Sequence, residues 1–223
     1  MTDTPFHSLP ASLALSRRRL IAAALAAAAP VPALAAQVPV VTILGDSITA
    51  GLGLPGRDAL PNQLHLALEK LGAPNVVRGA GVSGDTTADG LGRMDISIRA
   101  DSTVVVIALG GNDLLQGLDP KATRSNLDQI IRRLKARRRG VVLAGIKAPS
   151  EIGRSYASDF NAVFPALAAE HHVPLYPDLL AGVARNPTLN QGDGIHPNAR
   201  GVLIVARRLA PVVAKVLKSP PEG

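Results

Sequence analysis

Four short polar segments supply, in order along the chain, the groups that acyl transfer needs. They are residues 45–47 (Gly-Asp-Ser), 83–85 (Ser-Gly-Asp), 110–113 (Gly-Gly-Asn-Asp) and 193–196 (Asp-Gly-Ile-His). Together they offer a hydroxyl nucleophile, donors for an oxyanion, and a base with a carboxylate that can orient it. Each segment alone is common in turns. The complete set predicts a nucleophilic acyl-transfer site.

Ser47 is the candidate nucleophile, and it needs a base because a free hydroxyl reacts poorly near neutral pH. His196 is the best candidate for that base, and Asp193 can reach its other ring nitrogen from the same turn. Backbone N–H groups of Ser47 and Gly84, with the Asn112 side-chain amide, could hold the developing charge. The predicted catalytic residues are therefore Ser47, His196 and Asp193, and the predicted oxyanion hole is Ser47, Gly84 and Asn112.

Other roles for these residues stay open at this point. Ser47 could cap a helix that follows the first strand. Asn112 and Asp113 could form only an Asx turn. A third alternative is a divalent-cation site built from the acidic residues and the histidine of these segments. Its ligands would be Asp46, Asp113, Asp193 and His196. We expect neither a metal nor a cofactor, because the acyl-transfer interpretation uses all four segments.

Five apolar runs predict strands that are buried on both faces. They are residues 38–44, 75–77, 103–109, 140–144 and 173–176. Helical patterns lie between them, the clearest after Asp119 and Pro120, followed by residues 157–171 and 199–217. Pro211 is expected to kink or split the last helix. Three histidines in helical stretches have no partner that the sequence identifies, and each is expected to be structural or on the surface; they are His65, His171 and His172.

Strands that alternate with helices predict parallel βαβ units in one doubly wound sheet. The expected fold is a three-layer α/β/α, flavodoxin-like sandwich with five parallel strands in the order 2-1-3-4-5. In that order strand one lies between strands two and three. Ser47 would then lie between Gly84 and Asn112 at the carboxyl edge of the sheet, where such folds bind ligands. The segment with His196 precedes the last helix and could return over this edge.

The composition is that of one globular domain, with 223 residues, 47% apolar and 18% charged. Cysteine is absent, which excludes disulfides, thiolate metal sites and a cysteine nucleophile. Three arginines at 17–19 precede an apolar stretch and then Ala33-Leu34-Ala35. This pattern predicts a signal peptide over residues 1–35 and leaves residues 36–223 as the folded domain. The arginines resemble a twin-arginine signal, so we expect a periplasmic or secreted protein.

The mature chain is mildly basic. Cleavage would remove three Arg and one Asp from 24 basic and 17 acidic residues, which leaves a net charge of +5. This balance favours anionic surfaces such as lipid headgroups as additional partners. The basic run at residues 132–139 closes a predicted helix, where cations complement the helix dipole. No aromatic side chains interleave this run, so nucleic acid is not an expected partner. Stable membrane insertion after signal cleavage is not expected either.

The four segments resemble, in order and spacing, those of the SGNH (GDSL-type) hydrolases, and within them a group of bacterial periplasmic thioesterases, lysophospholipases and arylesterases. Similar stretches are residues 44–51, 81–87, 109–113 and 193–198. The resemblance implies the same catalytic and oxyanion residues, and the same flavodoxin-like fold. Ile48 stands where the motif has Leu, a swap that conserves volume. Ala148 and Ile152 stand where relatives carry larger residues, so the acyl-chain preference is open.

The predicted function is an exported serine hydrolase of carboxylic esters or thioesters, which forms an acyl-enzyme on Ser47. Apolar residues after Asn112 and in the loop after strand four are expected to bind the acyl chain. These are Leu114, Leu115, Leu118, Ala148 and Ile152. One alternative is a carbohydrate O-acetyl esterase that uses the same site. Another is a non-catalytic binding module, which Asp46 disfavours because a carboxylate in a phosphate loop repels its ligand.

Overall fold

A computed structural model describes Met1 and residues 37–219 of the chain. Residues 1–37 and 38–223 form separate units, and every helix and strand named below belongs to the second. The predicted signal peptide, residues 1–35, lies outside the described residues apart from Met1. Its boundary with the hydrolase domain therefore stays a prediction.

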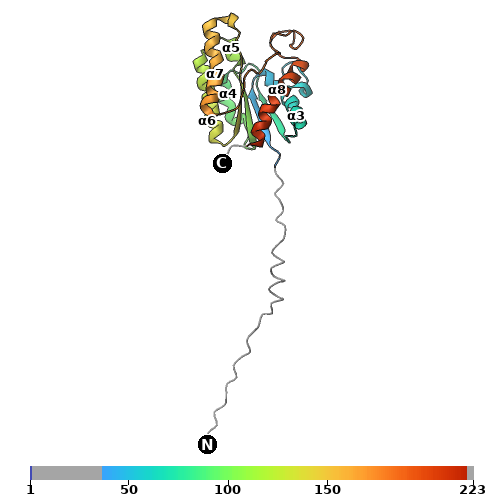
Figure 1. Cartoon of the computed structure of the whole chain (residues 1–223), viewed down its shortest axis with the longest axis vertical. Coiled ribbons are helices and arrows are strands. Elements are labelled where there is room, and N and C mark those ends of the chain that lie inside the picture. The colour runs from blue at the N-terminus through green and yellow to red at the C-terminus, as the bar shows by residue number, and fades with distance from the viewer. Residues whose placement is uncertain (2–36, 220–223) are drawn as a thin grey trace. The chain divides into compact units, whose positions relative to one another are not determined.

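A five-stranded parallel sheet forms the centre of the second unit (Figure 1). Its strands are β1 (Val40–Gly45), β2 (Val76–Gly81), β3 (Ser102–Ala108), β4 (Gly140–Ala144) and β5 (Leu175–Tyr176). The strand order is β2-β1-β3-β4-β5, and all four neighbouring pairs are parallel. The fold prediction is thus confirmed, including the position of β1 between β2 and β3.

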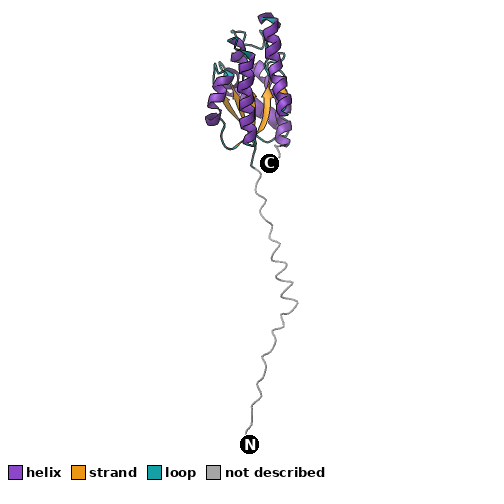
Figure 2. Ribbon diagram, turned by 90° about the vertical axis from the view of Figure 1, so that its left-hand side faces the viewer, coloured by secondary structure: helices purple, strands orange, loops and turns teal. Residues whose placement is uncertain are grey.

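Helices cover both faces of the sheet. They are α2 (Ser47–Ala50), α3 (Leu60–Lys70), α4 (Thr87–Ser97), α5 (Gly111–Leu115), α6 (Pro120–Ala136), α7 (Arg154–His171) and α8 (Ala199–Lys218), with 3-10 turns η1 (Gly56–Asp58) and η2 (Ser150–Ile152). Helices α3 and α8 pack together on one face. Helices α4, α6 and α7 cover the other, which faces the viewer in Figure 2. The result is a three-layer sandwich.

Strand β2 differs from its prediction. The strands β1 and β4 are buried along their whole length, as apolar runs predict. Strand β2 is exposed or half-buried throughout, and Val76 is 44% exposed. The expectation that residues 75–77 are buried on both faces is therefore wrong. The physical reason is that β2 is an edge strand, which pairs only with β1.

The last helix is not split at its proline. Helix α8 is continuous from Ala199 to Lys218 and contains Pro211, so the predicted split is wrong, while the alternative of a kink stays a prediction. Pro211 lies on the exposed side, while Leu209, Ala210 and Val213 beside it are buried. Burial of this apolar face offsets the loss of one backbone hydrogen bond at the proline. The predicted start of α6 is confirmed, because Asp119 caps the helix and Pro120 is its first residue.

The register of the three strands β2, β1 and β3 brings three polar segments to one edge. Gly45, at the end of β1, pairs with Gly81 of β2 and with Ala108 of β3. Helix α2 starts directly after β1 and passes close to the end of β2. A Cβ atom on Gly81 would lie 2.4 Å from the backbone nitrogen of Ala50. Glycine at this position therefore lets the helix that begins with Ser47 approach the sheet.

Candidate active site

Ser47 is the first residue of α2 rather than its cap. The cap is Asp46, whose carboxylate accepts a hydrogen bond from the Ile48 backbone N–H at 3.0 Å. The alternative role of Ser47 as a helix cap is therefore wrong. Only 8% of Ser47 is exposed, and the residue lines a cavity at this edge of the sheet. The tight strand-to-helix turn thus presents its hydroxyl to the cavity.

Three side chains form a continuous hydrogen-bonded chain. The Nε2 atom of His196 lies 2.8 Å from the Oγ atom of Ser47. The Nδ1 atom of His196 lies 2.6 Å from the Oδ2 atom of Asp193. The structure therefore brings together the serine, histidine and aspartate that the sequence singled out, although 149 residues separate Ser47 from His196. An Nδ1–H that donates to Asp193 leaves Nε2 free to accept the serine proton.

Asp193 is held in its ionised form by donors around it. Its side-chain hydrogen bond with His196 has the largest effect, and the backbone N–H groups of Ile195 and His196 also donate to it, at 2.9 and 3.0 Å. These bonds lower its pKa to about 2. A carboxylate that stays ionised can orient the imidazole ring and stabilise its protonated form.

Asp46 has the opposite environment. The residue is 4% exposed, and its burial raises the pKa of the carboxyl group to about 6. The hydrogen bond from Ile48 and the nearby His196 lower this pKa, but they only partly offset burial. Asp46 also lines the cavity beside Ser47. The acyl-transfer interpretation of the sequence gave Asp46 no chemical role, and its burial next to the candidate nucleophile is a finding of the structure.

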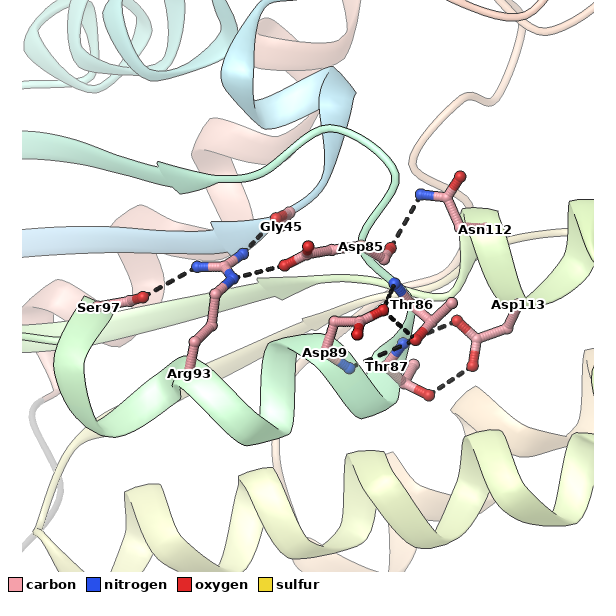
Figure 3. Close-up of polar contacts among 9 residues, drawn as sticks. All are labelled: Gly45, Asp85, Thr86, Thr87, Asp89, Arg93, Ser97, Asn112 and Asp113. Atoms are coloured by element: carbon pink, nitrogen blue, oxygen red, sulfur yellow. Dashed lines mark hydrogen bonds and ion pairs between the residues drawn. The ribbon is translucent and has the colours of Figure 1, made fainter.

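Asn112 contacts the loop that follows β2. The Asn112 side-chain amide donates one N–H to the Asp85 backbone carbonyl at 2.9 Å (Figure 3). Asn112 lines the cavity, whereas Gly84, which is exposed, does not. Gly84 precedes Asp85 directly and has a φ of +89°, a conformation that favours glycine. The structure therefore places Asn112 at the cavity and Gly84 in the loop that Asn112 contacts.

Asp113 anchors this region rather than forming only a local turn. Its carboxylate accepts from the Thr87 backbone N–H at 2.8 Å and the Thr87 hydroxyl at 2.5 Å (Figure 3). It also accepts from the Thr123 hydroxyl at 3.0 Å. Asp113 thus ties α5 to α4 and α6. The alternative in which Asn112 and Asp113 form nothing but an Asx turn is wrong.

The acidic residues and the histidine proposed as cation ligands do not gather around one point. Within residues 37–219, the group whose ligand atoms could surround an ion is a different one, Asp128 with Glu170 and His171. These side chains are already paired, His171 with Asp128 at 2.7 Å and Glu170 with Arg124 at 2.6 Å. Two of the three histidines whose partners could not be identified from the sequence have one in the structure, since His65 also lies 3.0 Å from the Asn75 side chain.

The cavity has a volume of about 440 Å³ and a largely apolar wall. Of the predicted acyl-chain residues, Leu114, Leu115 and Ala148 line it. Leu118 and Ile152 do not: the backbone of Leu118 is held by Asp113 and the Tyr156 hydroxyl, and Ile152 lies exposed in η2. Ile146, Leu180 and Ala184 also line the wall, although the sequence did not single them out. Ile146 and Leu180 could have been found, because both follow strands at this edge.

A three-layer α/β/α fold with a Ser–His–Asp chain at the carboxyl edge of its sheet is the architecture of an SGNH hydrolase. Comparison with known proteins gives the family. The GDSL-like Lipase/Acylhydrolase family matches residues 43–203. The chain belongs to this family of ester-bond hydrolases.

Individual relatives agree with this assignment. "Thioesterase 1/protease 1/lysophospholipase L1" of Escherichia coli (strain K12) is 36% identical over 184 residues, which cover 80% of this chain and 87% of that protein. "Arylesterase" of Vibrio mimicus is 34% identical over 176 residues, which cover 78% and 88%. The crystal structure of TesA superposes with a TM-score of 0.75 at 34% identity, covering 80% of this chain and 99% of that one. Among the described residues, we find no helix with the length and apolar character that crossing a membrane requires.

Proposed function

We propose that the protein is an exported serine esterase and thioesterase that works through an acyl-enzyme on Ser47. The observation that carries this proposal is the unbroken chain of short hydrogen bonds from Ser47 through His196 to Asp193. A hydroxyl in contact with an imidazole, which a carboxylate orients in turn, is the arrangement that nucleophilic acyl transfer needs.

Acylation begins when the Ser47 oxygen attacks the carbonyl carbon of the substrate. The Nε2 atom of His196 takes the hydroxyl proton, and the carbonyl becomes a tetrahedral oxyanion. When the carbon–oxygen or carbon–sulfur bond breaks, His196 gives that proton to the departing alcohol or thiol. Asp193 stays ionised throughout, since its donors keep its pKa at about 2. The product of this step is an ester of the acyl group with Ser47.

Three donors are proposed to hold the oxyanion. They are the backbone N–H groups of Ser47 and Gly84 and the second N–H of the Asn112 amide, whose first N–H donates to Asp85. Donors fixed in advance stabilise the developing charge without reorganisation. In the second half of the reaction, His196 removes a proton from water, which attacks the carbonyl carbon of the acyl-enzyme. His196 then gives that proton to the Ser47 oxygen as the ester bond breaks, which releases the carboxylic acid and restores the serine hydroxyl.

The apolar cavity supports an acyl chain as the part of the substrate that is bound. Leu114, Leu115 and Ala148, together with Ile146 and Leu180, line its wall. Each buried methylene should contribute up to about 0.8 kcal/mol, roughly fourfold in kcat/KM, until the cavity is filled. We therefore propose a preference for chains of about four to ten carbons over acetyl. Esters and thioesters both fit this proposal, and the relatives are named as a thioesterase and an arylesterase.

A panel of substrates with the purified mature protein tests this function. We expect p-nitrophenyl esters of butyrate to decanoate, acyl-CoAs and lysophospholipids to be cleaved faster than p-nitrophenyl acetate. Ser47→Ala should abolish hydrolysis, by up to about 10⁶-fold, and a fluorophosphonate should label Ser47. Label on another serine, such as Ser83, would overturn the mechanism. A steep preference for acetylated sugars would favour the carbohydrate O-acetyl esterase instead, and an inert protein would favour the binding module.

A further inference from the structure

One guanidinium group links the two backbone segments that border the candidate oxyanion hole (Figure 3). Arg93 of α4 donates from Nη2 to the Gly45 carbonyl at 2.8 Å. From Nε it donates to the Asp85 carboxylate at 2.5 Å, and from Nη1 to the Ser97 hydroxyl at 3.0 Å. All three nitrogens are thus engaged, each with a different partner.

Both segments carry proposed oxyanion donors. Gly45 ends β1, and the chain continues through Asp46 to the N–H of Ser47. Asp85 directly follows Gly84, and its backbone carbonyl accepts a hydrogen bond from the Asn112 side-chain amide at 2.9 Å. The contacts of Arg93 therefore reach the segments of all three proposed donors. Gly45 leads to the Ser47 N–H, while Asp85 follows Gly84 and accepts from the Asn112 amide.

The contacts of Arg93 are sheltered from water. Its side chain is 20% exposed and that of Asp85 is 11% exposed. An ion pair in such a place is screened less than one on the open surface. The planar guanidinium fork holds two acceptors in a set geometry, which a lysine ammonium on a flexible stem cannot reproduce. Arg93 does not line the cavity, so it is not placed to touch the substrate.

Other bonds hold the same region together without Arg93. The Val82 N–H donates to the Gly45 carbonyl at 3.2 Å. Helix α4 has its own capping box between Thr86 and Asp89, and Asp113 binds its first turn at Thr87. Removal of the guanidinium should therefore loosen the relative placement of the two segments while the helix and the strand stay formed.

We propose that Arg93 is a positioning residue that sets the spacing of the oxyanion donors. The proposal rests on the proposed function of Ser47, Gly84 and Asn112. A donor displaced from the oxyanion loses transition-state stabilisation, whereas the apolar wall of the cavity, which Arg93 does not line, binds the acyl chain as before. Loss of the Arg93 guanidinium therefore lowers kcat and leaves KM unchanged.

The first test measures kcat and KM for p-nitrophenyl butyrate with Arg93→Met. We expect kcat and kcat/KM to fall together by about 10- to 100-fold, with KM unchanged within about twofold. Arg93→Lys keeps the charge but not the fork, and it should lose about as much. The matched control is Arg78→Met in β2, which breaks an exposed pair with Asp101 and should leave kcat unchanged. An unchanged kcat in folded Arg93→Met or Arg93→Lys overturns the proposal.

A double variant separates positioning from charge. Arg93→Met leaves the Asp85 carboxylate without its cation, and that alone could lower activity. Asp85→Asn combined with Arg93→Met removes both charges. If kcat stays low, the contact geometry matters, as proposed; if kcat returns to the wild-type value, the unpaired charge was the cause and the proposal is wrong. Ser47→Ala separates failure of the Arg93 proposal from failure of the proposed function. Activity that survives Ser47→Ala refutes the proposed function itself.

Discussion

Asp46→Asn should make the folded protein more stable at neutral pH. The residue is 4% exposed, and burial raises its pKa to about 6 from an ordinary value of 3.8. Asparagine has nearly the same shape, carries no charge, and keeps an oxygen that can accept the Ile48 N–H. The substitution therefore removes the charge from a buried position while the helix cap remains.

The size and sign of the effect follow from proton linkage. Between about pH 4 and pH 6 the folded protein holds a proton on Asp46 that the unfolded chain has lost. The free energy of unfolding therefore falls as pH rises through this window. A difference of about two pKa units corresponds to about 3 kcal/mol, which is the most that Asn can recover above pH 6. At pH 4 under about 1 kcal/mol of this difference remains, because folded Asp46 is protonated there.

Urea unfolding followed by far-UV circular dichroism measures this effect, since the chain has no Trp to report by fluorescence. We expect Asp46→Asn to gain about 1–3 kcal/mol over the wild type at pH 8, and most of that gain to vanish at pH 4. Asp159→Asn, at an exposed position of α7, is the control and should change stability by less than about 0.5 kcal/mol. An equal gain at both pH values, or a loss at pH 8, would show that the buried charge is not the cause.

Three further predictions concern the site and the N-terminus. Asn112→Ala removes one proposed oxyanion donor and should lower kcat for p-nitrophenyl butyrate about 10²–10³-fold; the exposed Asn62→Ala should not, and a normal kcat in the first variant would remove Asn112 from the mechanism. Activity should survive treatment with a chelator and dialysis, because the proposed chemistry uses side chains and backbone groups alone; activity that is lost and then restored by a divalent cation would contradict this. Mass spectrometry of the exported protein should find Ala36 at the N-terminus, and Arg17→Lys with Arg18→Lys should block export only if the twin-arginine route is used.

The sheet and its strand order could be predicted because their causes are local and repeated. Apolar runs at β1, β3 and β4 form strands that are almost wholly buried, and helical patterns between them require parallel crossovers. Once β1 lies between β2 and β3, the residues after each strand must meet at one edge. Ser47 and Asn112 could therefore be brought together by topology, with no knowledge of side-chain geometry.

The contacts of loops and helix faces could not be predicted in the same way. His171 meets Asp128 across 43 residues, and Arg93 meets Gly45 across 48. Nothing in the spacing of either pair indicates contact, because it depends on how two elements pack. Leu118 has the apolar character of its neighbours Leu114 and Leu115, yet a turn after α5 places it outside the cavity wall. Composition predicts an apolar wall, whereas the path of the backbone selects its members.

The two aspartates that interact with His196 differ in environment, and that difference links stability to activity. Asp193 is exposed and its pKa is lowered to about 2, whereas buried Asp46 has a pKa of about 6. Above pH 6 both are negative, so a protonated His196 in the transition state has two anions near it. The buried charge that destabilises the fold should then stabilise the reaction. Asp46→Asn should accordingly have a lower kcat than the wild type at pH 8. At pH 5 the ratio of the variant's kcat to that of the wild type should be near one. A ratio that is the same at both pH values would mean that the charge of Asp46 plays no part in the chemistry.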